Sequence, residues 1–284
     1  MKIAVLGPEG TFSDKAYLEY VEVMSTDGVT LEPTYYPTID EVFSAVCPGE
    51  CDLGIVPVEN TLDGYVQRTL DLLLEKDVHI IDENQVKVQF SLVGNVTNLE
   101  EINKLYVQFK SNGQCRQFIN SLENIKIITT ESNMESYYNL GSEQGAAAIV
   151  PKHIAKKEQD RFVVDNVTDA DNNHTRFLVI TKGSADDKRV EAVRTTNLDK
   201  KVRIPVYIMP ATERPGILFE ILKSFSEKQI NLISIMSRPT KQELGTYNFY
   251  IEIDGYHSQL DDIMDTLHSM KEFNDIKILG IYNE

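Results

Sequence analysis

The chain has 284 residues, which is enough for roughly two domains of ordinary size. Its 28 Lys and Arg residues are outnumbered by 44 Asp and Glu residues, which gives a formal net charge of −16. This charge disfavours nucleic acids and anionic membrane surfaces as partners, and an anionic small molecule must find a local group of cations or backbone amides.

The amino-terminal segment and the cysteines favour a cytoplasmic protein. The apolar run before Gly7 is too short for the core of a signal peptide, and no run approaches the length of a membrane span. Cys47, Cys51 and Cys115 are an odd number of cysteines without a secretory context, and the first two lack the further ligands of a zinc site. We therefore expect reduced thiols and no bound metal.

Strand and helix patterns alternate through residues 1–182, which indicates an α/β domain. Short apolar runs predict strands at 2–7, 53–58, 78–82, 87–94, 104–109, 125–130 and 146–150. Amphipathic patterns predict helices after Gly7-Pro8 with Thr11 or Ser13 as the cap, at 38–46 with Thr38 as the cap, at 62–76 and at 112–122. The glycine spacing matches neither a dinucleotide fingerprint nor a P-loop, so we expect no nucleotide cofactor.

Three polar clusters stand at the ends of predicted strands. They are Gly10-Thr11-Phe12, Glu59-Asn60-Thr61 and His174-Thr175-Arg176. Ligands of α/β sheets bind at strand ends, in crevices between structural units. These clusters are therefore candidates for a common binding site, with Arg176 as a permanently charged partner for a carboxylate.

The remainder of the chain has a different pattern. Residues 183–200 are polar and charged and are predicted to form a linker. Residues 201–284 follow the order β-α-β-β-α-β, with helical patterns at 216–230 and 258–271. That order is typical of a ferredoxin-like domain.

Several short motifs in this order resemble those of prephenate dehydratases with a C-terminal ACT regulatory domain. They are "LGPEGTFS" (6–13), "VPVEN" (56–60) followed by "DG", "QC" (114–115), "NNHTRF" (172–177), "RPGILFEIL" (214–222) and "MSRP" (236–239). The resemblance covers essentially the whole chain. It implies a two-lobed catalytic domain over 1–182, similar to periplasmic binding proteins, with a cleft between lobe one (about 1–80 and 170–182) and lobe two (about 81–169), followed by the ACT domain.

The resemblance also implies a reaction and a set of site residues. Prephenate would lose carbon dioxide and its ring hydroxyl to give phenylpyruvate, driven by aromatisation and without a cofactor. The implied catalytic residues are Thr175, Asn60, Gln114 and Glu59, and the substrate-binding residues are Arg176, Thr11, Gly10, Phe177, Thr61 and Glu131. Thr175 would donate a hydrogen bond to the departing hydroxyl, while Arg176 would bind a carboxylate.

Four positions depart from the family pattern. Thr61 replaces the usual Ser, Gln108 and Phe109 replace the usual His and Pro, and Met236 replaces the usual Glu of the regulatory motif. The family properties imply L-phenylalanine as an inhibitory effector and a homodimer or homotetramer formed through the ACT domains. The expected effector site comprises Gly216, Ile217, Leu218, Ser237, Arg238 and Pro239.

Two other functions fit the same pattern. An arogenate dehydratase would act on the amino analogue of the keto substrate, and a sensor protein would bind an amino acid without catalysis.

We expect Cys115 to be a buried, inert side chain and His174 to be structural.

Overall fold

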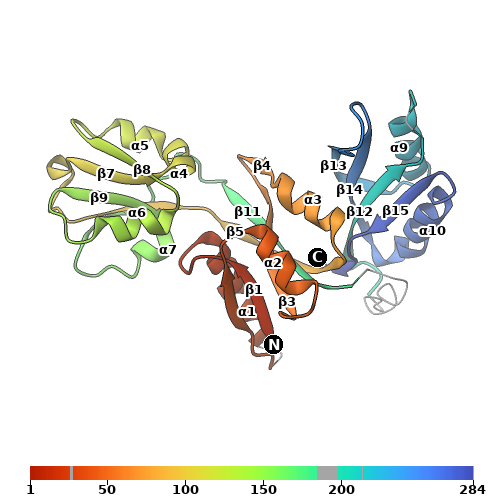
Figure 1. Ribbon diagram of the computed structural model, residues 1–284, viewed down its shortest axis with the longest axis horizontal. Coiled ribbons are helices and arrows are strands. Elements are labelled where there is room, and N and C mark those ends of the chain that lie inside the picture. The colour runs from red at the N-terminus through yellow and green to blue at the C-terminus, as the bar shows by residue number, and fades with distance from the viewer. Residues whose placement is uncertain (26–27, 184–196, 213, 284) are drawn as a thin grey trace.

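The computed structural model describes residues 1–25, 28–183, 197–212 and 214–283 of the chain. Its strands form three sheets, and lobe one lies between lobe two and the C-terminal domain (Figure 1). Within the described ranges, no helix is both long and apolar enough to cross a membrane. Most of the expected linker, residues 184–196, lies outside the described part.

The first sheet belongs to lobe one and has the order β2-β1-β3-β11-β5, with β4 paired to β3. Its strands are β1 (Lys2–Leu6), β2 (Glu32–Tyr36), β3 (Leu53–Asn60), β4 (Gly64–Tyr65), β5 (Val78–Lys87) and β11 (His174–Lys182). Its helices are α1 (Phe12–Ser25), α2 (Ile39–Val46) and α3 (Gln67–Glu75). β1 runs parallel to β2 and β3, whereas β11 runs antiparallel to both β3 and β5.

Helix starts in lobe one follow their capping residues. The Thr38 side chain accepts a hydrogen bond from the Glu41 amide at the start of α2, as predicted. At α1, the Thr11 hydroxyl accepts from the Asp14 amide at 3.3 Å, so Thr11 rather than Ser13 is the capping residue.

Two sequence-based boundaries in lobe one are wrong. The lobe boundary expected near residue 80 falls inside β5, which pairs with β11 up to Lys87 and so belongs wholly to the first sheet. The helix expected from 62 begins only at Gln67, because Gly64 has a φ of 74° and β4 pairs with β3 before the helix starts.

The second sheet belongs to lobe two and has the order β10-β6-β9-β7-β8. Its strands are β6 (Phe90–Gly94), β7 (Lys104–Gln108), β8 (Lys126–Thr130), β9 (Ala146–Pro151) and β10 (Phe162–Val164). Its helices are η1 (Leu99–Glu101), α4 (Phe109–Gln114), α5 (Arg116–Asn120), α6 (Asn133–Leu140) and α7 (Lys152–Ala155). The single helix expected at 112–122 is thus two short helices that meet at Cys115, where Asp169 accepts from the Arg116 amide at 2.7 Å.

The C-terminal domain has the predicted β-α-β-β-α-β order. Its antiparallel sheet has the order β13-β14-β12-β15, with β16 paired to β12, as in ferredoxin-like folds. The elements are β12 (Lys201–Pro210), α9 (Ile217–Glu227), β13 (Asn231–Pro239), β14 (Tyr247–Tyr256), η2 (His257–Gln259), α10 (Leu260–Met270), β15 (Asn274–Ile278) and β16 (Tyr282–Asn283). The two helices pack on one face of the sheet through a core that includes Ile251, Phe225 and Leu267.

The other face of this C-terminal sheet packs directly on lobe one. Tyr207 and Tyr250 share a core cluster with Leu70 and Leu73 of α3, and the Tyr207 hydroxyl donates to the Leu70 carbonyl at 3.0 Å. Because the two domains share buried apolar side chains, the C-terminal domain is fixed against lobe one and does not hang freely from a linker.

Candidate active site

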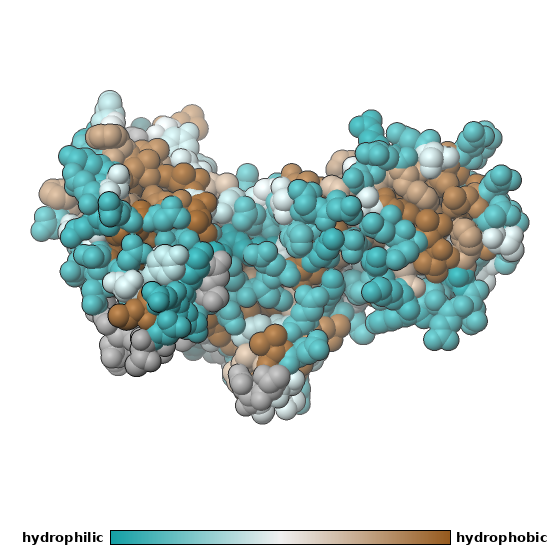
Figure 2. Space-filling model, turned by 180° about the vertical axis from the view of Figure 1, so that it is seen from behind, coloured by the Kyte–Doolittle hydropathy of each residue, from teal (hydrophilic) through white to brown (hydrophobic). Residues whose placement is uncertain are grey.

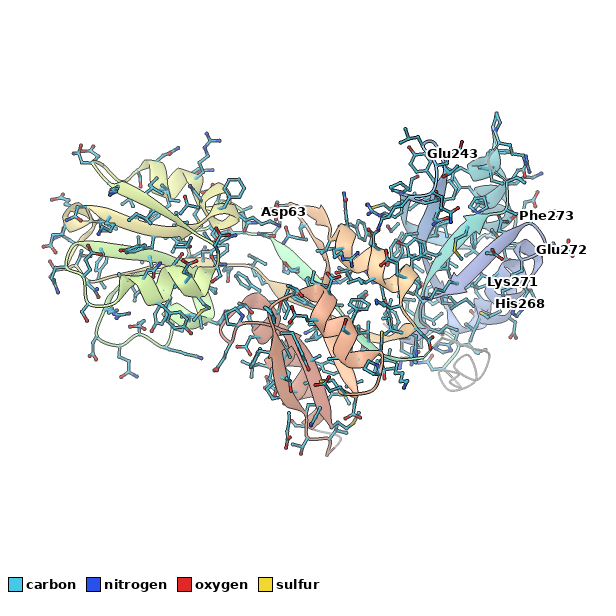
Figure 3. The ribbon with its side chains drawn as sticks, viewed as in Figure 1. Asp63, Glu243, His268, Lys271, Glu272 and Phe273 are labelled. Atoms are coloured by element: carbon cyan, nitrogen blue, oxygen red, sulfur yellow. The ribbon has the colours of Figure 1, made fainter. Side chains whose placement is uncertain are left out.

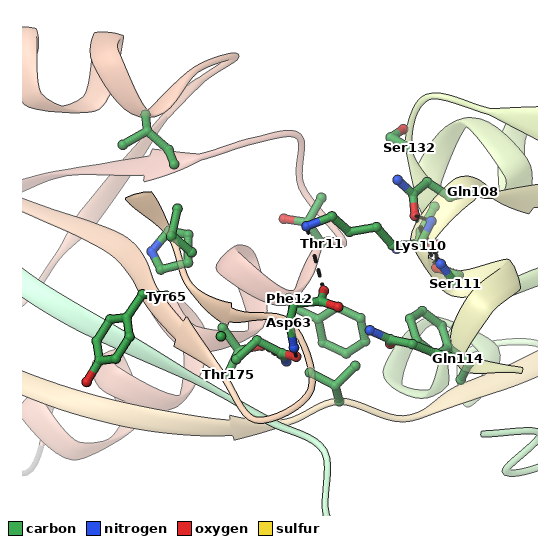
Figure 4. Close-up of a pocket in the computed structure, with 18 of the residues that line it drawn as sticks. Thr11, Phe12, Asp63, Tyr65, Gln108, Lys110, Ser111, Gln114, Ser132 and Thr175 are labelled. Atoms are coloured by element: carbon green, nitrogen blue, oxygen red, sulfur yellow. Dashed lines mark hydrogen bonds and ion pairs between the residues drawn. The ribbon is translucent and has the colours of Figure 1, made fainter. Parts of the chain in front are cut away.

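A cavity of about 680 Å³ lies between the two lobes. Lobe one contributes the end of β3, the start of β11, the start of α1 and the β4–α3 segment. Lobe two contributes the start of β6, both ends of α4 and the start of α6 (Figure 4). Its lining residues are Thr11, Phe12, Ile39, Pro57, Asn60, Asp63, Gly64, Tyr65, Val66, Gln67, Val88, Phe90, Gln108, Lys110, Ser111, Gln114, Glu131, Ser132, Asn133 and Thr175. The volume and the mixed apolar and polar lining suit a small organic ligand.

Thr175 and Asn60 face each other across the β11–β3 pair. The Asn60 side-chain amide donates to the Thr175 hydroxyl oxygen at 2.9 Å, and it also donates to the His174 carbonyl. The Asn60 carbonyl oxygen accepts from the amides of Leu62 and Asp63, both at 3.0 Å, which fixes its orientation. Since the Thr175 oxygen already accepts a hydrogen bond, its own proton remains available for a ligand in the cavity.

Asn173, which the sequence did not single out as a site residue, extends this network to lobe two. It is fully buried, accepts from the Asn60 amide at 2.8 Å and donates to the Gln114 carbonyl oxygen at 3.1 Å. This uses the oxygen of Gln114 and leaves its NH₂ group for the cavity. The position of Asn173 within "NNHTRF" was the only available signal, and it does not distinguish this residue from the exposed Asn172.

The charged groups of the cavity come from both lobes. Lys110 of α4 and Asp63, which follows β3, approach each other to 3.6 Å across the opening (Figure 4). Glu131 adds a second carboxylate beside Ser132, the residue that caps α6. Lys110 is the only cationic side chain among the described lining residues, so an anionic ligand would find its main attraction at the lobe-two side.

The structure places Arg176 and Glu59 away from the cavity, which corrects their assignment. Successive side chains of a strand point to opposite faces, so Arg176 faces away from the cavity that Thr175 lines. Its guanidinium donates to Glu59 at 3.1 Å and to Glu83 at 3.0 Å, and both carboxylates lie on the far side of the sheet. Neither residue is positioned to contact a ligand in the cavity.

The other predicted residues divide between the cavity and its surroundings. Thr11, Gln114 and Glu131 line the cavity, as expected. Three others do not line it: the Gly10 amide donates to Asp14, Phe177 is buried in the core of lobe one, and the Thr61 hydroxyl donates to the His174 carbonyl.

Aromatic side chains join the lobes beside the cavity. Phe12 of α1 meets Phe90 of β6 edge to face, with ring centroids 5.3 Å apart. Phe12 also contacts His153 of α7, whose Nε2 donates to the Gly10 carbonyl at 2.9 Å. Burial lowers the pKa of His153, which favours the neutral ring at this contact.

Cys115 is buried as expected, and burial raises the pKa of its thiol. A thiol with a raised pKa is a poor nucleophile at neutral pH. The described residues contain no group of three or more His, Cys, Asp or Glu side chains arranged to hold a metal ion.

The residues expected to bind an effector lie on two elements of the C-terminal domain. Gly216 has a φ of 90° and precedes α9, Ile217 and Leu218 pack towards the domain core, and Ser237 is exposed on β13. Arg238 is placed differently, because its buried guanidinium donates to Asp71 of α3 at 2.7 and 3.0 Å. It therefore joins the domain to lobe one.

Comparisons with known proteins agree with this architecture. The family model described as prephenate dehydratase matches residues 3–185. A prephenate dehydratase of Methanocaldococcus jannaschii is 30% identical over 277 residues, which cover 97% of this chain and 95% of that protein. The crystal structure of the prephenate dehydratase from Staphylococcus aureus matches with a TM-score of 0.80 at 28% identity and covers 100% of both chains. A prephenate dehydratase from Arthrobacter aurescens in complex with L-Phe matches with a TM-score of 0.81 at 27% identity and covers 100% of this chain and 90% of that one.

Proposed function

The chain belongs to the prephenate dehydratase family of hydro-lyases, and we propose that the cavity between its lobes is where prephenate is converted to phenylpyruvate. In this reaction the bond from the ring to its carboxylate breaks and carbon dioxide leaves. The released electron pair completes the aromatic ring as the ring C–O bond breaks, and the departing hydroxide takes a proton to become water.

The single observation that carries the site assignment is the hydrogen bond from Asn60 to the Thr175 hydroxyl oxygen at the cavity wall. Asn60 donates to this oxygen at 2.9 Å, so the hydroxyl proton is directed elsewhere, and Thr175 lines the cavity. A hydrogen bond from Thr175 to the ring hydroxyl becomes stronger as negative charge develops on the departing oxygen. Such a bond stabilises the transition state more than the bound substrate.

The remaining lining residues match the rest of the substrate. Phe12, Phe90 and Val88 provide an apolar surface for the ring. We assign one carboxylate of the dianion to Lys110, because it is the cation available among the described lining residues. The NH₂ group of Gln114 would orient the ring substituents from lobe two.

The assignment is tested by replacing Thr175 with Ala and measuring phenylpyruvate formation from prephenate by absorbance. We expect kcat to fall about 10²- to 10³-fold with little change in KM, as for removal of one donor to a developing oxyanion. Thr175→Ser restores a hydroxyl and should recover part of the rate. A Thr175→Ala enzyme with unchanged kcat would remove Thr175 from the reaction. Parallel assays with arogenate decide between the two substrates, which differ only in a keto or an amino group.

For the C-terminal domain we propose an ACT-type regulatory role with L-phenylalanine as the effector. Support comes from its ferredoxin-like strand order and from the relative described in complex with L-Phe. The left-handed backbone at Gly216 starts an eleven-residue helix, and the amino-terminal end of such a helix suits the carboxylate of an amino acid. Arg238 is omitted from this site because Asp71 holds it.

Calorimetric titration with phenylalanine tests the regulatory site separately from the catalytic one. The Thr175→Ala protein should still bind phenylalanine, whereas Gly216→Val should bind it weakly, because a β-branched residue is strained at a φ of 90°. Phenylalanine that competes with prephenate and still binds Gly216→Val would place the effector in the catalytic cavity.

We further propose that the protein is a cytoplasmic homo-oligomer paired through its C-terminal domains. Brown, hydrophobic residues gather over both ends of the face shown in Figure 2, and one of these ends is the C-terminal domain. The large apolar side chains exposed on this domain are Phe219, Ile233, Ile235, Leu244, Tyr247, Tyr256 and Phe273. Light scattering of the full chain measures the oligomeric state, and a monomer at micromolar concentration would contradict this proposal.

A further inference from the structure

A buried cluster of charged side chains joins β11 of lobe one to the C-terminal domain. Its centre is the Arg176 guanidinium, which donates to Glu252 of β14 at 2.6 Å, to Glu83 of β5 at 3.0 Å and to Glu59 of β3 at 3.1 Å. The side chains of Arg176 and Glu252 are only 8% and 1% exposed. The Arg176–Glu252 contact is therefore the shortest and most buried of the three, and it crosses between the domains.

Other polar groups complete the cluster. Arg203 of β12 donates to Glu83 at 2.5 Å, Tyr282 donates to Glu83 at 2.9 Å, and Tyr250 donates to Glu252. Burial by itself would lower the pKa of Arg176, but the charges of Glu252 and Glu83 outweigh it and raise the pKa. Two arginines and two phenols thus donate to three carboxylates, and such a connected network permits few alternative arrangements.

This ionic cluster lies directly behind the proposed catalytic hydrogen bond. In the β11–β3 register Thr175 pairs with Asn60, and Arg176 pairs with Glu59. The Thr175–Asn60 bond and the Arg176–Glu59 ion pair therefore join the same two strands at successive positions, on opposite faces of the sheet. The β11–β3 register shifts immediately after Arg176, so the ladder to β3 is irregular at this end of β11, whereas β11 stays in register with β5 from His174 to Val179.

A second contact links the cavity wall to the same part of the C-terminal sheet. Tyr65 lines the cavity, its hydroxyl donates to Ser234 of β13 at 2.7 Å, and its ring meets Tyr250 edge to face with centroids 6.0 Å apart. Tyr250 in turn donates to Glu252. Both β11 and the β4 segment of the cavity are thus held by one region of the C-terminal sheet.

We infer that Arg176 is a positioning residue through which the C-terminal domain, by way of Glu252, holds Thr175 at the reacting position. The inference rests on the proposed role of Thr175. The inference predicts that Glu252 affects turnover through Arg176, although Glu252 belongs to the C-terminal domain and lies outside the cavity. A displacement of about 1 Å at a catalytic group lowers rates up to about 100-fold, so a modest shift of β11 is sufficient.

The test is a double-mutant cycle in the full chain with Arg176→Lys, Glu252→Gln and the double variant. We expect each single variant to lower kcat about 10- to 100-fold while KM changes less than about twofold, because no substrate contact is lost. The double variant should be about as slow as the slower single variant, because both changes disrupt one interaction. Asp262→Asn, which alters an exposed carboxylate paired with Lys228 in the same domain, is the matched control and should leave kcat unchanged.

Several results would overturn the inference. A higher KM with unchanged kcat in Arg176→Lys means that Arg176 contacts the substrate carboxylate. Unchanged kcat in Glu252→Gln, or additive losses in the double variant, mean that the cluster serves only to join the domains. If Glu252→Gln does not fold, Tyr250→Phe removes only one donor to Glu252 and must lower kcat with KM retained. Thr175→Ala is assayed alongside these variants. Unchanged turnover in Thr175→Ala would contradict the proposed catalytic site itself. If turnover in Thr175→Ala falls as expected, a failure of the other variants counts only against the positioning role.

Discussion

Thr175 and Arg176 are adjacent on β11 but serve different parts of the molecule. Thr175 lines the cavity between the lobes and accepts from Asn60, whereas Arg176 is turned towards the C-terminal domain and donates to Glu252. Two residues of one motif therefore have separate roles, one at the proposed reacting position and one behind it.

Asn173 is expected to be as important for turnover as the residues that face the ligand. Its side chain connects Asn60 to Gln114, so Asn173→Ala should lower kcat and leave the Gln114 carbonyl oxygen without its donor, while Asn60 keeps its bonds to Thr175 and His174. The loss of unfolding free energy should be about 1–3 kcal/mol, as for other buried polar groups that lose a partner. Steady-state kinetics and urea unfolding measure both effects, with the exposed neighbour Asn172→Ala as the control. Equal behaviour of the two variants would contradict the proposed network.

Lys110→Met is expected to weaken substrate binding. The change removes the cation from the cavity and keeps most of the side-chain volume, so KM should rise while kcat falls less. The effect of salt provides a second measurement, because added salt screens an exposed charge and should raise KM of the wild type more than KM of the variant. Lys126→Met on β8, outside the cavity, is the control. An unchanged KM for Lys110→Met would assign the carboxylate to another group.

Lys277 is expected to contribute to stability by holding the end of α3. Its ammonium group, on β15, donates to the carbonyls of Leu73, Leu74 and Lys76 at 2.7, 3.0 and 2.6 Å. The last turn of α3 has no basic residue of its own, so the C-terminal domain supplies the cation that favours a helix end. Lys277→Met should lower the unfolding free energy by about 1–3 kcal/mol.

The control for this measurement is Lys271→Met. Figure 3 shows Lys271 on the outer side of the C-terminal domain, away from α3, and a change there should stay within about 0.5 kcal/mol. If the two variants unfold at the same urea concentration, the contact of Lys277 with α3 contributes nothing measurable.

His153 is expected to make stability depend on pH. Burial lowers its pKa in the folded protein, whereas in the unfolded chain it has the ordinary value of about 6.5. As the pH falls below about 6.5, the unfolded chain therefore takes up the proton first, and the folded state loses stability. In His153→Gln this part of the loss should be absent, so the decrease in urea midpoint between pH 8 and pH 5.5 should be smaller than in the wild type. The control is His268→Gln, on the outer side of the C-terminal domain in Figure 3, which should retain the wild-type decrease in urea midpoint. If the midpoint of His153→Gln also decreases as much as in the wild type, His153 does not cause the pH dependence.

The sequence alone determined the local structure and the family. Short apolar runs predicted most of the strands, though not β2 or β4, and Thr38 predicted the start of α2, because both signals depend only on neighbouring residues. The order of elements in residues 201–284 was correct for the same reason. Motifs with a fixed order placed Thr175, Asn60, Gln114, Thr11 and Glu131 at one site, and the structure brings all five to the cavity.

Only the tertiary structure decided which sides of the strands face the ligand and what covers the other sides. The two-residue period of β11 separates Thr175 from Arg176, but it does not say which of them faces the cavity. That choice follows from the packing of the C-terminal sheet on lobe one, which places Glu252, distant in sequence, beside Arg176. A buried arginine needs carboxylate partners, and these partners come from three strands and two domains, so Arg176 is directed away from the substrate by contacts that no local pattern contains.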